Sequence, residues 1–558
     1  MIYELLLMIY VLGTLVGLGL VFRKASVAVW KAFVPLWNVW LWVRLCGKRW
    51  FWFVGMLIPG LNIFQFCLLV CETARVFRRY GFWEQLVGVL LPCFYLPWLG
   101  LLPEEKPRVT EASAAGDANG QVGASSSAAG GAKLGFVLPK RCGERWVASY
   151  HDPRVEPPMR VSDGRDWTEA FIYALIAAVL IRAFVFELFS IPSSSMEKSL
   201  LVGDHLLVSK MAYGPRVIQT PLALPLMHNT IVGTHAKSYI DNPRLPYYRF
   251  PGYTHVKRFD AVVFNFPAGD TVLLAYPGGE VTYYDAVRQC GREAVLDGSA
   301  VLYGQRLGGI VVRPVDKREH YIKRCVGLPG EDLEVKDQVV HINGKPVETP
   351  EQAQFHHMVV FAGGVNPTPH LDACGVSQED MERLFVQHDI AGNTVLMGLP
   401  LTSDAVKELQ KRSSVLSVER MHYTDYDSTY NLFPSDPRYR WSLDSFGPIH
   451  IPAKGEELHL TLDNLPLYRR VITAYEGNTL EVRDGVIYIN GNATDRYTVQ
   501  QNYYWMMGDN RHGSQDSRFW GFVPEDHIAG KAKWVLWNRD KDHGGLRWNR
   551  TLRNANKR

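Results

Sequence analysis

The first hundred residues carry long apolar runs, whereas most of the later chain alternates between apolar and polar positions with the period of a β-strand. Residues 4–22 are leucine-rich and long enough to cross the hydrocarbon core of a bilayer, and 50–71 and 82–102 are further candidate spans. Residues 27–45 are rich in tryptophan but interrupted by charges and a proline, which favours a re-entrant or interfacial segment. The pattern predicts a polytopic membrane region over 1–102 with about three spans. It leaves open whether this region is only an anchor or also a partner-binding or regulatory module.

A flexible linker is predicted between this region and a fourth apolar segment. Residues 103–166 are mostly small, polar or glycine, and such residues bury too little surface to fold. Residues 167–189 form a predicted transmembrane anchor with Arg182 near its far end, where the side chain would snorkel. Basic residues between the first two spans favour a cytoplasmic loop, which leaves the linker inside and everything after Phe189 outside. Three arginines oppose this orientation, because it places them on the outer side: Arg75, Arg78 and Arg79.

Short β-branched and aromatic runs follow the anchor and predict strands at 205–208, 260–266 and 321–326. An internal echo is also present, because LEVKDQVVHING at 333–344 resembles LEVRDGVIYING at 480–491. Each copy predicts two strands joined by a tight turn, with an Asn-Gly turn after them. A duplicated hairpin is the simplest interpretation, and convergence on favourable hairpin chemistry is the alternative.

The region between the two echoes has a different residue pattern, and this pattern predicts an α/β insertion in a mainly-β domain. The stretch 377–380 resembles a helix N-cap with its supporting acid, which predicts a helix over 377–388, and a second helix is predicted over 403–421. The predicted domains after the anchor are the first part of a catalytic β core (190–345), the insertion (346–457), the second part of the core (458–545) and a basic tail (546–558).

Composition removes several function classes. The chain has 558 residues, which predicts roughly two to four domains, and a net charge of +4 gives no basic surplus for nucleic acid. Eight cysteines show no disulfide framework or zinc spacing, and the apolar start without a basic region favours an uncleaved N-terminus. Four residues of the insertion suggest a metal site, but their spacing matches no standard one: His356, His357, His370 and Cys374. No metal or other cofactor is expected.

Three stretches carry candidate chemistry. Serines 193–195 follow a proline at the mouth of the predicted anchor, where a nucleophile would face the bilayer surface. Lys323 stands in a predicted strand among apolar neighbours, and a buried lysine becomes a general base near neutral pH. Residues 508–521 form a polar loop bounded by glycines, which suits the orientation of a site. Taken alone, each stretch also fits a plainer interpretation: a polar loop, a solvated edge charge and a turn with salt bridges.

Together and in this order, the stretches resemble bacterial signal peptidase I, the membrane-bound Ser/Lys endopeptidase. The matching segments are IPSSSMEKSLLVGDHLLVSKMAYG at 191–214, RFDAVVF at 258–264, YIKRCVGLPGE at 321–331 and MGDNRHGSQDSRFWGFVPEDHIAGKA at 507–532. The resemblance covers the core and the span before it, but not the first hundred residues. The echo and the insertion lie outside the minimal pattern and are similar to the enlarged members of Bacteroidetes type.

The resemblance implies a role for each matching residue. It places the nucleophile on Ser195, the general base on Lys323, and the oxyanion hole on the Ser193 hydroxyl and the Ser195 backbone N–H. It places orienting and supporting groups in the glycine-bounded loop, at Gly508, Ser514, Asp516 and Arg518. It places the substrate pockets near Phe189, Ile191, Leu206, Tyr321 and Ile322. The chain departs from the family pattern at Ser194, Lys198-Ser199 and Gly513, and none of these departures removes a catalytic group.

The resemblance also implies the substrates and the location. Signal peptides of exported preproteins would be cut after small-X-small sites, with the enzyme in the inner membrane and its catalytic domain on the exported, periplasmic side. The lipid bilayer is an expected partner, and the N-terminal region is a candidate to bind translocation machinery. Two alternatives remain: a self-cleaving protein of the repressor type, which the spans and the lack of a DNA-binding helix pair oppose, and a polytopic scaffold or receptor whose β domain only binds.

Overall fold

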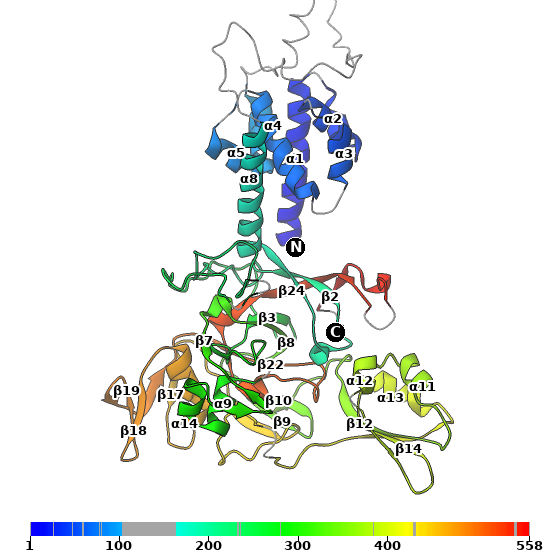
Figure 1. Ribbon diagram of the computed structural model, residues 1–558, viewed down its shortest axis with the longest axis vertical. Helices are drawn as coiled ribbons and strands as arrows, with labels where there is room; N and C mark the ends of the chain where they lie inside the picture. Colours follow the sequence, from blue (N-terminus) through cyan, green and yellow to red (C-terminus); the bar gives the residue numbers. More distant parts are fainter. Residues whose placement is uncertain are drawn as a thin grey trace, which may run out of the picture. The chain divides into compact units, whose positions relative to one another are not determined.

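The computed structural model describes residues 2–102 and 163–556, apart from 26, 47, 49, 58–60, 78, 80, 232–233, 235, 280, 383, 428–430 and 541–543. The predicted linker therefore lies almost wholly outside the described residues. The chain divides into two units, Met1–Leu180 and Ile181–Arg558, and each is considered by itself (Figure 1).

The first unit is helical. Its helices are α1 (Ile2–Lys24), α2 (Trp37–Leu45), α3 (Trp50–Met56), α4 (Leu61–Val76), α5 (Phe82–Leu90), α6 (Pro92–Leu101) and most of α8 (Asp163–Phe184), with a 3-10 turn at Val29–Phe33. Glycines allow α1 and α6 to pack closely, because a Cβ on Gly17 would lie 2.4 Å from Pro97 Cδ. The buried face includes Phe22, Leu69 and Leu96.

Two of the predicted spans are broken. Residues 50–71 are divided between α3 and α4, and 82–102 bends by 119° between α5 and α6, where Pro92 begins the new helix. Within the described part of the chain, no single helix has both the length and the hydropathy of a bilayer span. The bent α5–α6 pair meets both conditions only when its two helices are combined.

The second unit is built on an eight-stranded antiparallel sheet in the order β1-β2-β24-β3-β8-β22-β23, with β25 paired to β24 (Figure 1). The strands are β1 (Phe186–Ser190), β2 (Asp204–Ser209), β3 (Ala261–Asn265), β8 (His320–Gly327), β22 (Tyr503–Met507), β23 (Val523–Pro524), β24 (Ile528–Asn538) and β25 (Arg553–Asn554). Three of them confirm the predicted strands near 205, 261 and 321. Every residue of β3 is buried, because both faces of the sheet are covered.

The echoed segments both form the predicted hairpins. The first gives β9 (Asp332–Lys336), β10 (Val339–Ile342) and β11 (Lys345–Pro346), and the second gives β18 (Leu480–Arg483), β19 (Val486–Ile489) and β20 (Asn492–Ala493). Their tight turns need positive φ at both central residues, 47° and 68° at Asp337-Gln338 and 51° and 77° at Asp484-Gly485. A common origin for the two copies stays a prediction.

The insertion contains a sheet in the order β13-β14-β12-β15, with helices beside it. The predicted helix starts are correct, because Ser377 Oγ accepts from Asp380 N and Thr402 Oγ1 accepts from Ala405 N. The predicted lengths are wrong, since both helices stop early and their second halves become strands. The elements are β12 (Phe355–Phe361), α11 (Thr368–Ala373), α12 (Gln378–Glu382), β13 (Phe385–His388), β14 (Thr394–Leu401), α13 (Ser403–Gln410) and β15 (Val415–Arg420).

Smaller elements complete the unit. Before β8 come β4 (Thr271–Leu273), α9 (Tyr283–Cys290), α10 (Arg292–Leu296), β5 (Val301–Leu302), β6 (Gln305–Arg306) and β7 (Ile310–Val312). After the insertion's sheet come β16 (Phe446–His450), β17 (Glu457–His459), α14 (Leu465–Arg470) with a π-helical extension at Val471–Tyr475, β21 (Arg496–Thr498) and α15 (Ser517–Trp520). Strand β16 pairs with β9 and so joins the first hairpin.

The predicted basic tail packs against the core. Arg550 donates to both carboxylate oxygens of Asp204, from Nε at 3.0 Å and from Nη2 at 2.5 Å, and also to the carbonyl of Ser199 at 3.2 Å. Both side chains of the pair are buried. Arg550 therefore holds in place the segment that leads from Ser195 to β2.

We expect Arg550→Ala to lower the unfolding temperature of the detergent-solubilised protein, because it leaves the buried Asp204 carboxylate without its partner. Breaking such a pair costs about 3–5 kcal/mol. The control is Arg496→Ala, which removes an exposed pair with Glu457 and should cost at most about 1 kcal/mol. Circular dichroism follows both transitions, and equal midpoints for the two variants would contradict this role of Arg550.

Candidate active site

The segment after β1 presents Ser195 on a short, fixed turn. The Ile191 amide donates to the carbonyl of Asp204 and the Ile191 carbonyl accepts from Gly203, both at 2.9 Å, which ties the segment to the start of β2. Ser193 is extended, with φ −130° and ψ 156°, and the 3-10 turn Ser194–Met196 follows it. Ser194 and Met196 are buried while Ser195 is partly exposed, so the turn directs only the candidate nucleophile toward solvent.

Lys323 reaches this serine from β8. Its Nζ lies 2.7 Å from Ser195 Oγ, and its side chain is buried where β8 pairs with β3. Burial lowers the pKa of Lys323 from its usual 10.5 to about 8, although Asp516 and Asp509 partly oppose this shift. The interpretation of Lys323 as a solvated edge charge is therefore wrong.

Gly508 allows the glycine-bounded loop to approach the serine. A Cβ at this position would lie 2.2 Å from Ser514 Oγ and 2.6 Å from the Ser195 carbonyl oxygen. Ser514 is buried, and its hydroxyl donates to the Gln515 carbonyl at 3.3 Å. Ser514 thus lies beside Gly508 and the Ser195 backbone, and its orienting action on Lys323 stays a prediction.

The predicted ion pair between Asp516 and Arg518 is present. Arg518 Nε and Nη2 each donate to one Asp516 oxygen at 2.9 Å, and Asp516 Oδ2 also accepts from the Gly508 amide at 3.1 Å. Arg518 further donates to the carbonyl of Leu443 at 3.2 Å. Because the charges are buried and mutually satisfied, the loop is held in one conformation.

Sequence reasoning missed a second buried pair next to the lysine. Arg324 donates to both oxygens of Asp509, from Nε at 2.7 Å and from Nη2 at 2.5 Å, and also to Ser199 Oγ at 3.2 Å. Burial raises the pKa of the Asp509 carboxyl, but Arg324 outweighs this and holds it below its usual value. The signal was present in the sequence, because Arg324 follows Lys323 and Asp509 follows Gly508.

Four of the five predicted pocket residues come together. Ile191 and Leu206 belong to one buried apolar cluster, and Phe189 and Ile322 pack against it. Tyr321 does not join them, because it lies in the neighbouring cluster and stacks on Phe266 with ring centroids 4.5 Å apart. Ser193 is exposed beside the turn, and its role as an oxyanion donor stays a prediction.

The insertion also contacts the glycine-bounded loop, which the sequence did not predict. The Gln354 amide donates to the Asp509 carbonyl at 2.8 Å, and the Arg511 amide donates to the Gln354 carbonyl at 3.0 Å. His512 accepts from the His356 amide at 3.0 Å, and its other ring nitrogen lies 2.7 Å from a buried oxygen of Asp444. The start of strand β12 therefore supports this loop.

The histidines considered for a metal site have other contacts. His356 Nδ1 lies 3.0 Å from the Tyr423 hydroxyl, His357 Nδ1 lies 2.8 Å from the Phe355 carbonyl, and His370 Nδ1 lies 3.0 Å from Arg412 Nη1. Within the described residues, no group of three or more His, Cys, Asp or Glu side chains is arranged to hold a metal ion.

Comparison with known proteins agrees with this geometry. Residues 164–389 and 492–537 match the family described as signal peptidase, peptidase S26, and residues 30–106 match a family of unknown function, DUF5684. Signal peptidase I of Haemophilus influenzae is 24% identical over 73% of this chain and 80% of its own length. That of Buchnera aphidicola from Baizongia pistaciae is 22% identical over 67% and 77%, and that of Aquifex aeolicus is 62% identical over 37 residues, 7% of this chain and 14% of its own. The chain is therefore similar to the peptidase S26 family of signal peptidases over the two segments that carry Ser195, Lys323 and the glycine-bounded loop.

Proposed function

We propose that this protein is a signal peptidase I, a serine endopeptidase that removes signal peptides from exported preproteins. The observation that carries the proposal is the 2.7 Å approach of Lys323 Nζ to Ser195 Oγ, with the lysine buried. A lysine serves as a general base only when it loses its proton near the working pH. With a pKa of about 8, roughly a tenth of Lys323 is neutral at pH 7, against under a thousandth for an ordinary lysine.

The proposed mechanism is acyl transfer through Ser195. Neutral Lys323 takes the Ser195 hydroxyl proton as Oγ attacks the scissile carbonyl carbon, and the Ser193 hydroxyl and the Ser195 amide donate to the developing oxyanion. The tetrahedral intermediate collapses, the C–N bond breaks, and the Lys323 ammonium gives its proton to the leaving amine. Lys323 then deprotonates a water that attacks the acyl ester, which releases the signal peptide and restores Ser195.

The proposed specificity follows from the apolar cluster beside the nucleophile. An extended substrate would lie as an added strand, with alternate side chains directed toward the sheet. Phe189, Ile191, Leu206 and Ile322 already fill this part of the sheet, so the room left for substrate side chains is small. Small residues at the first and third positions before the cut fit such shallow pockets, which favours Ala-X-Ala sites.

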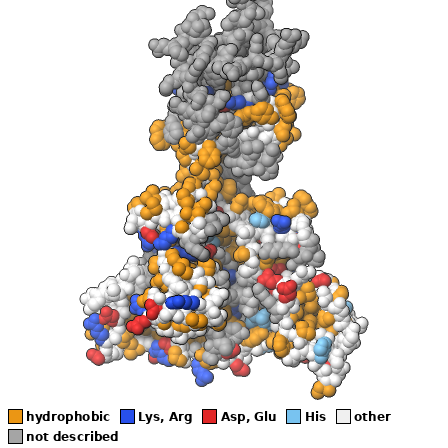
Figure 2. All heavy atoms as spheres, viewed as in Figure 1, with side chains coloured by type: hydrophobic (Ala, Val, Ile, Leu, Met, Phe, Trp, Pro, Cys, Tyr) orange, Lys and Arg blue, Asp and Glu red, His pale blue; other side chains and the backbone are white. Residues whose placement is uncertain are grey.

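We further propose that the catalytic unit works at the exported face of the inner membrane, in a multi-pass protein whose N-terminal region is a candidate to contact translocation machinery. Apolar side chains are exposed over the segment that follows β2, and Figure 2 shows hydrophobic side chains gathered on this part of the unit. The exposed residues are Leu222, Leu224, Leu226, Ile240, Leu245, Tyr247, Tyr248 and Phe250. Exposed apolar side chains gathered in one segment suit contact with a lipid bilayer.

Ser195→Ala, Lys323→Ala and Lys323→Arg should each reduce cleavage of an Ala-X-Ala preprotein by at least about 10³-fold, since nucleophile and base act as one unit. Arginine fails because its guanidinium stays protonated. Ser194→Gly, which introduces the common family residue beside the nucleophile, is the matched control and should keep activity. Gel-based processing with purified protein measures all four, and substantial turnover by the Ser195 variant would count against Ser195 as the nucleophile, whereas no cleavage by the unaltered protein would favour a β domain that only binds.

Cleavage should rise with pH through the pKa of Lys323. The sign follows from the required state, because the base must be neutral and the neutral fraction grows as pH passes about 8. We expect kcat/KM of a short peptide to increase about tenfold per pH unit below pH 7.5 and to level off above pH 9. A profile that is flat from pH 6 to pH 9 would contradict Lys323 as the base.

Ser193→Ala should lower kcat by roughly 10²–10³ and change KM little, because one oxyanion donor is lost while the Ser195 amide remains. Ser193→Thr keeps a hydroxyl at the same position and should recover much of the rate. Steady-state kinetics on the same peptide separate the two constants. An unchanged kcat in Ser193→Ala would mean that this hydroxyl does not face the oxyanion.

A further inference from the structure

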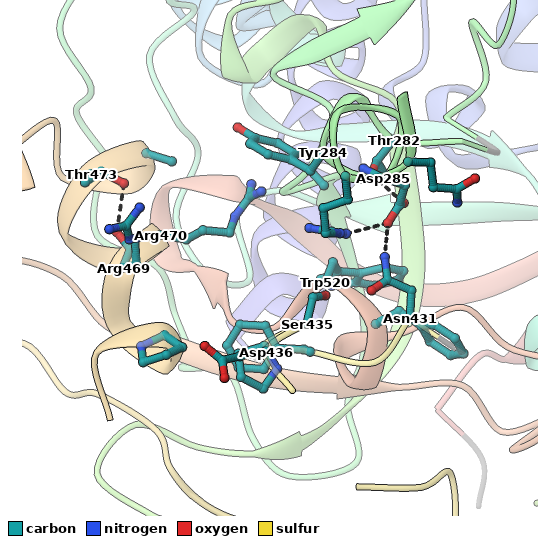
Figure 3. Close-up of a pocket in the computed structure, with 18 of the residues that line it drawn as sticks. Thr282, Tyr284, Asp285, Asn431, Ser435, Asp436, Arg469, Arg470, Thr473 and Trp520 are labelled. Carbon is teal, nitrogen blue, oxygen red and sulfur yellow. Dashed lines mark hydrogen bonds and ion pairs between the residues drawn. The ribbon is translucent and has the colours of Figure 1, made fainter. Parts of the chain in front are cut away.

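A large cavity is lined in part by the glycine-bounded loop, through Gln515, Phe519 and Trp520. Its volume is about 940 Å³, within the range of ligand sites, and all of its lining residues belong to the second unit (Figure 3). Helix α9, the segment 431–438 and helix α14 with its π-helical extension form its walls. The aromatic rings of Phe266 and Trp520 also line it.

Contacts with neighbouring residues fix the position of the Arg470 guanidinium in this cavity. Its guanidinium stacks on the Tyr284 ring at 4.1 Å and lies 5.3 Å from the Tyr475 ring, and Figure 3 shows it extending from α14 toward Tyr284. It donates to the Pro267 carbonyl at 3.2 Å and to the Tyr475 hydroxyl at 3.3 Å. These contacts fix the plane of the guanidinium.

Arg469, the preceding residue, also lines the cavity and is exposed. Within the described part of the chain, neither Arg469 nor Arg470 has a carboxylate at ion-pair distance. The other two arginines of the lining differ, since Arg288 pairs with Asp285 at 2.5 Å and Arg438 pairs with Asp436 at 2.8 Å. Four arginines and two aspartates leave a net charge of +2, and adjacent Arg469 and Arg470 carry it.

The charges and the apolar side chains of the cavity indicate which class of ligand it binds. Two guanidinium groups that have no carboxylate at ion-pair distance suit carboxylates, each of which accepts paired N–H donors in one plane. The two aspartates already present disfavour a dianion such as phosphate. Exposed apolar side chains at the rim, Tyr303, Leu462 and Val482, suit the aliphatic parts of a polypeptide rather than a small free acid.

We propose that this cavity binds an acidic peptide segment whose carboxylates are held by Arg469 and Arg470, the mode in which arginine clusters recognise acidic motifs. The occupant would lie against the back of the catalytic loop. Gln515 and Trp520 line the cavity, while their neighbours Ser514 and Asp516 lie on the side of Gly508 and Ser195. Trp520 also packs edge-on against Tyr321, with ring centroids 5.6 Å apart.

The test measures binding and does not require peptidase activity. Full-length Ser195→Ala protein in detergent is titrated into a fluorescein-labelled octapeptide that alternates Glu and Leu, with a Gln-Leu peptide as the neutral match. Fluorescence anisotropy should show the Glu peptide binding at least about tenfold more tightly, because hydrogen bonds to charged groups are the stronger ones. Added salt should weaken the binding of the Glu peptide selectively.

Substitutions assign the binding to the cavity. Arg469→Ala should weaken the Glu peptide about fivefold, and Arg469→Glu should abolish its preference over the Gln peptide. Arg438→Ala is the matched control in the same cavity, and it should change affinity less than twofold because its charge is already paired. Arg469 is exposed, so neither of its variants is expected to unfold the protein.

Three outcomes would overturn the proposal. Equal affinity for the two peptides would show that carboxylates are not recognised. An unchanged affinity in both Arg469 variants would show that the peptide does not bind in this cavity. Displacement of the Glu peptide by acetate at the same concentration of carboxylate groups would show that a free small acid, rather than a peptide, is the ligand.

Discussion

The site depends on keeping water away from Lys323. Holding its pKa near 8 instead of 10.5 costs the folded state about 3 kcal/mol at neutral pH, because the ammonium form is then buried. The cost is present below pH 8 and disappears as pH rises toward the unfolded value, the reverse of the usual behaviour of a paired lysine. The rest of the sheet must therefore supply stability while placing no strong anion directly on Nζ.

Two buried Asp–Arg pairs supply stability and keep their carboxylates from pairing with Lys323 Nζ. Asp509 is satisfied by Arg324 and Asp516 by Arg518, so their charges fix the loop instead of pairing with the lysine. The two carboxylates still oppose the effect of burial on Lys323, and the resulting pKa is a balance of the two. If either arginine were absent, the released carboxylate would hold the lysine protonated more strongly, so each arginine helps to keep the pKa of Lys323 low as well as stabilising the fold.

The sequence predicted the chemistry better than the architecture around it. Ser195, Lys323 and the Asp516–Arg518 pair were found because their motifs are local, and the hairpins were found because turn residues with positive φ leave a clear signal. The helix lengths in the insertion were wrong, since tertiary pairing in β13 and β15 outweighed local helix preference. The Asp204–Arg550 pair and the contact of Gln354 with Asp509 join segments far apart in the chain, and no single-sequence pattern reports such contacts.

The insertion is part of the active site's support, not a separate appendage. Its first strand, β12, is preceded by Gln354, which bonds through its backbone to Asp509 and Arg511, while His512 from the loop reaches back to Asp444 beyond the insertion's sheet.

Burial lowers the pKa of His512, although Asp444 partly opposes the shift, so the ring is neutral near pH 7 and donates one hydrogen bond while accepting another. A neutral ring can satisfy Asp444 and the His356 amide together, whereas a protonated ring would have no acceptor for that amide. The same loop thus contacts the Ser195 backbone and is supported by the insertion, so a change in the insertion's first strand would reach Ser195 through the Asn510 amide that binds its carbonyl.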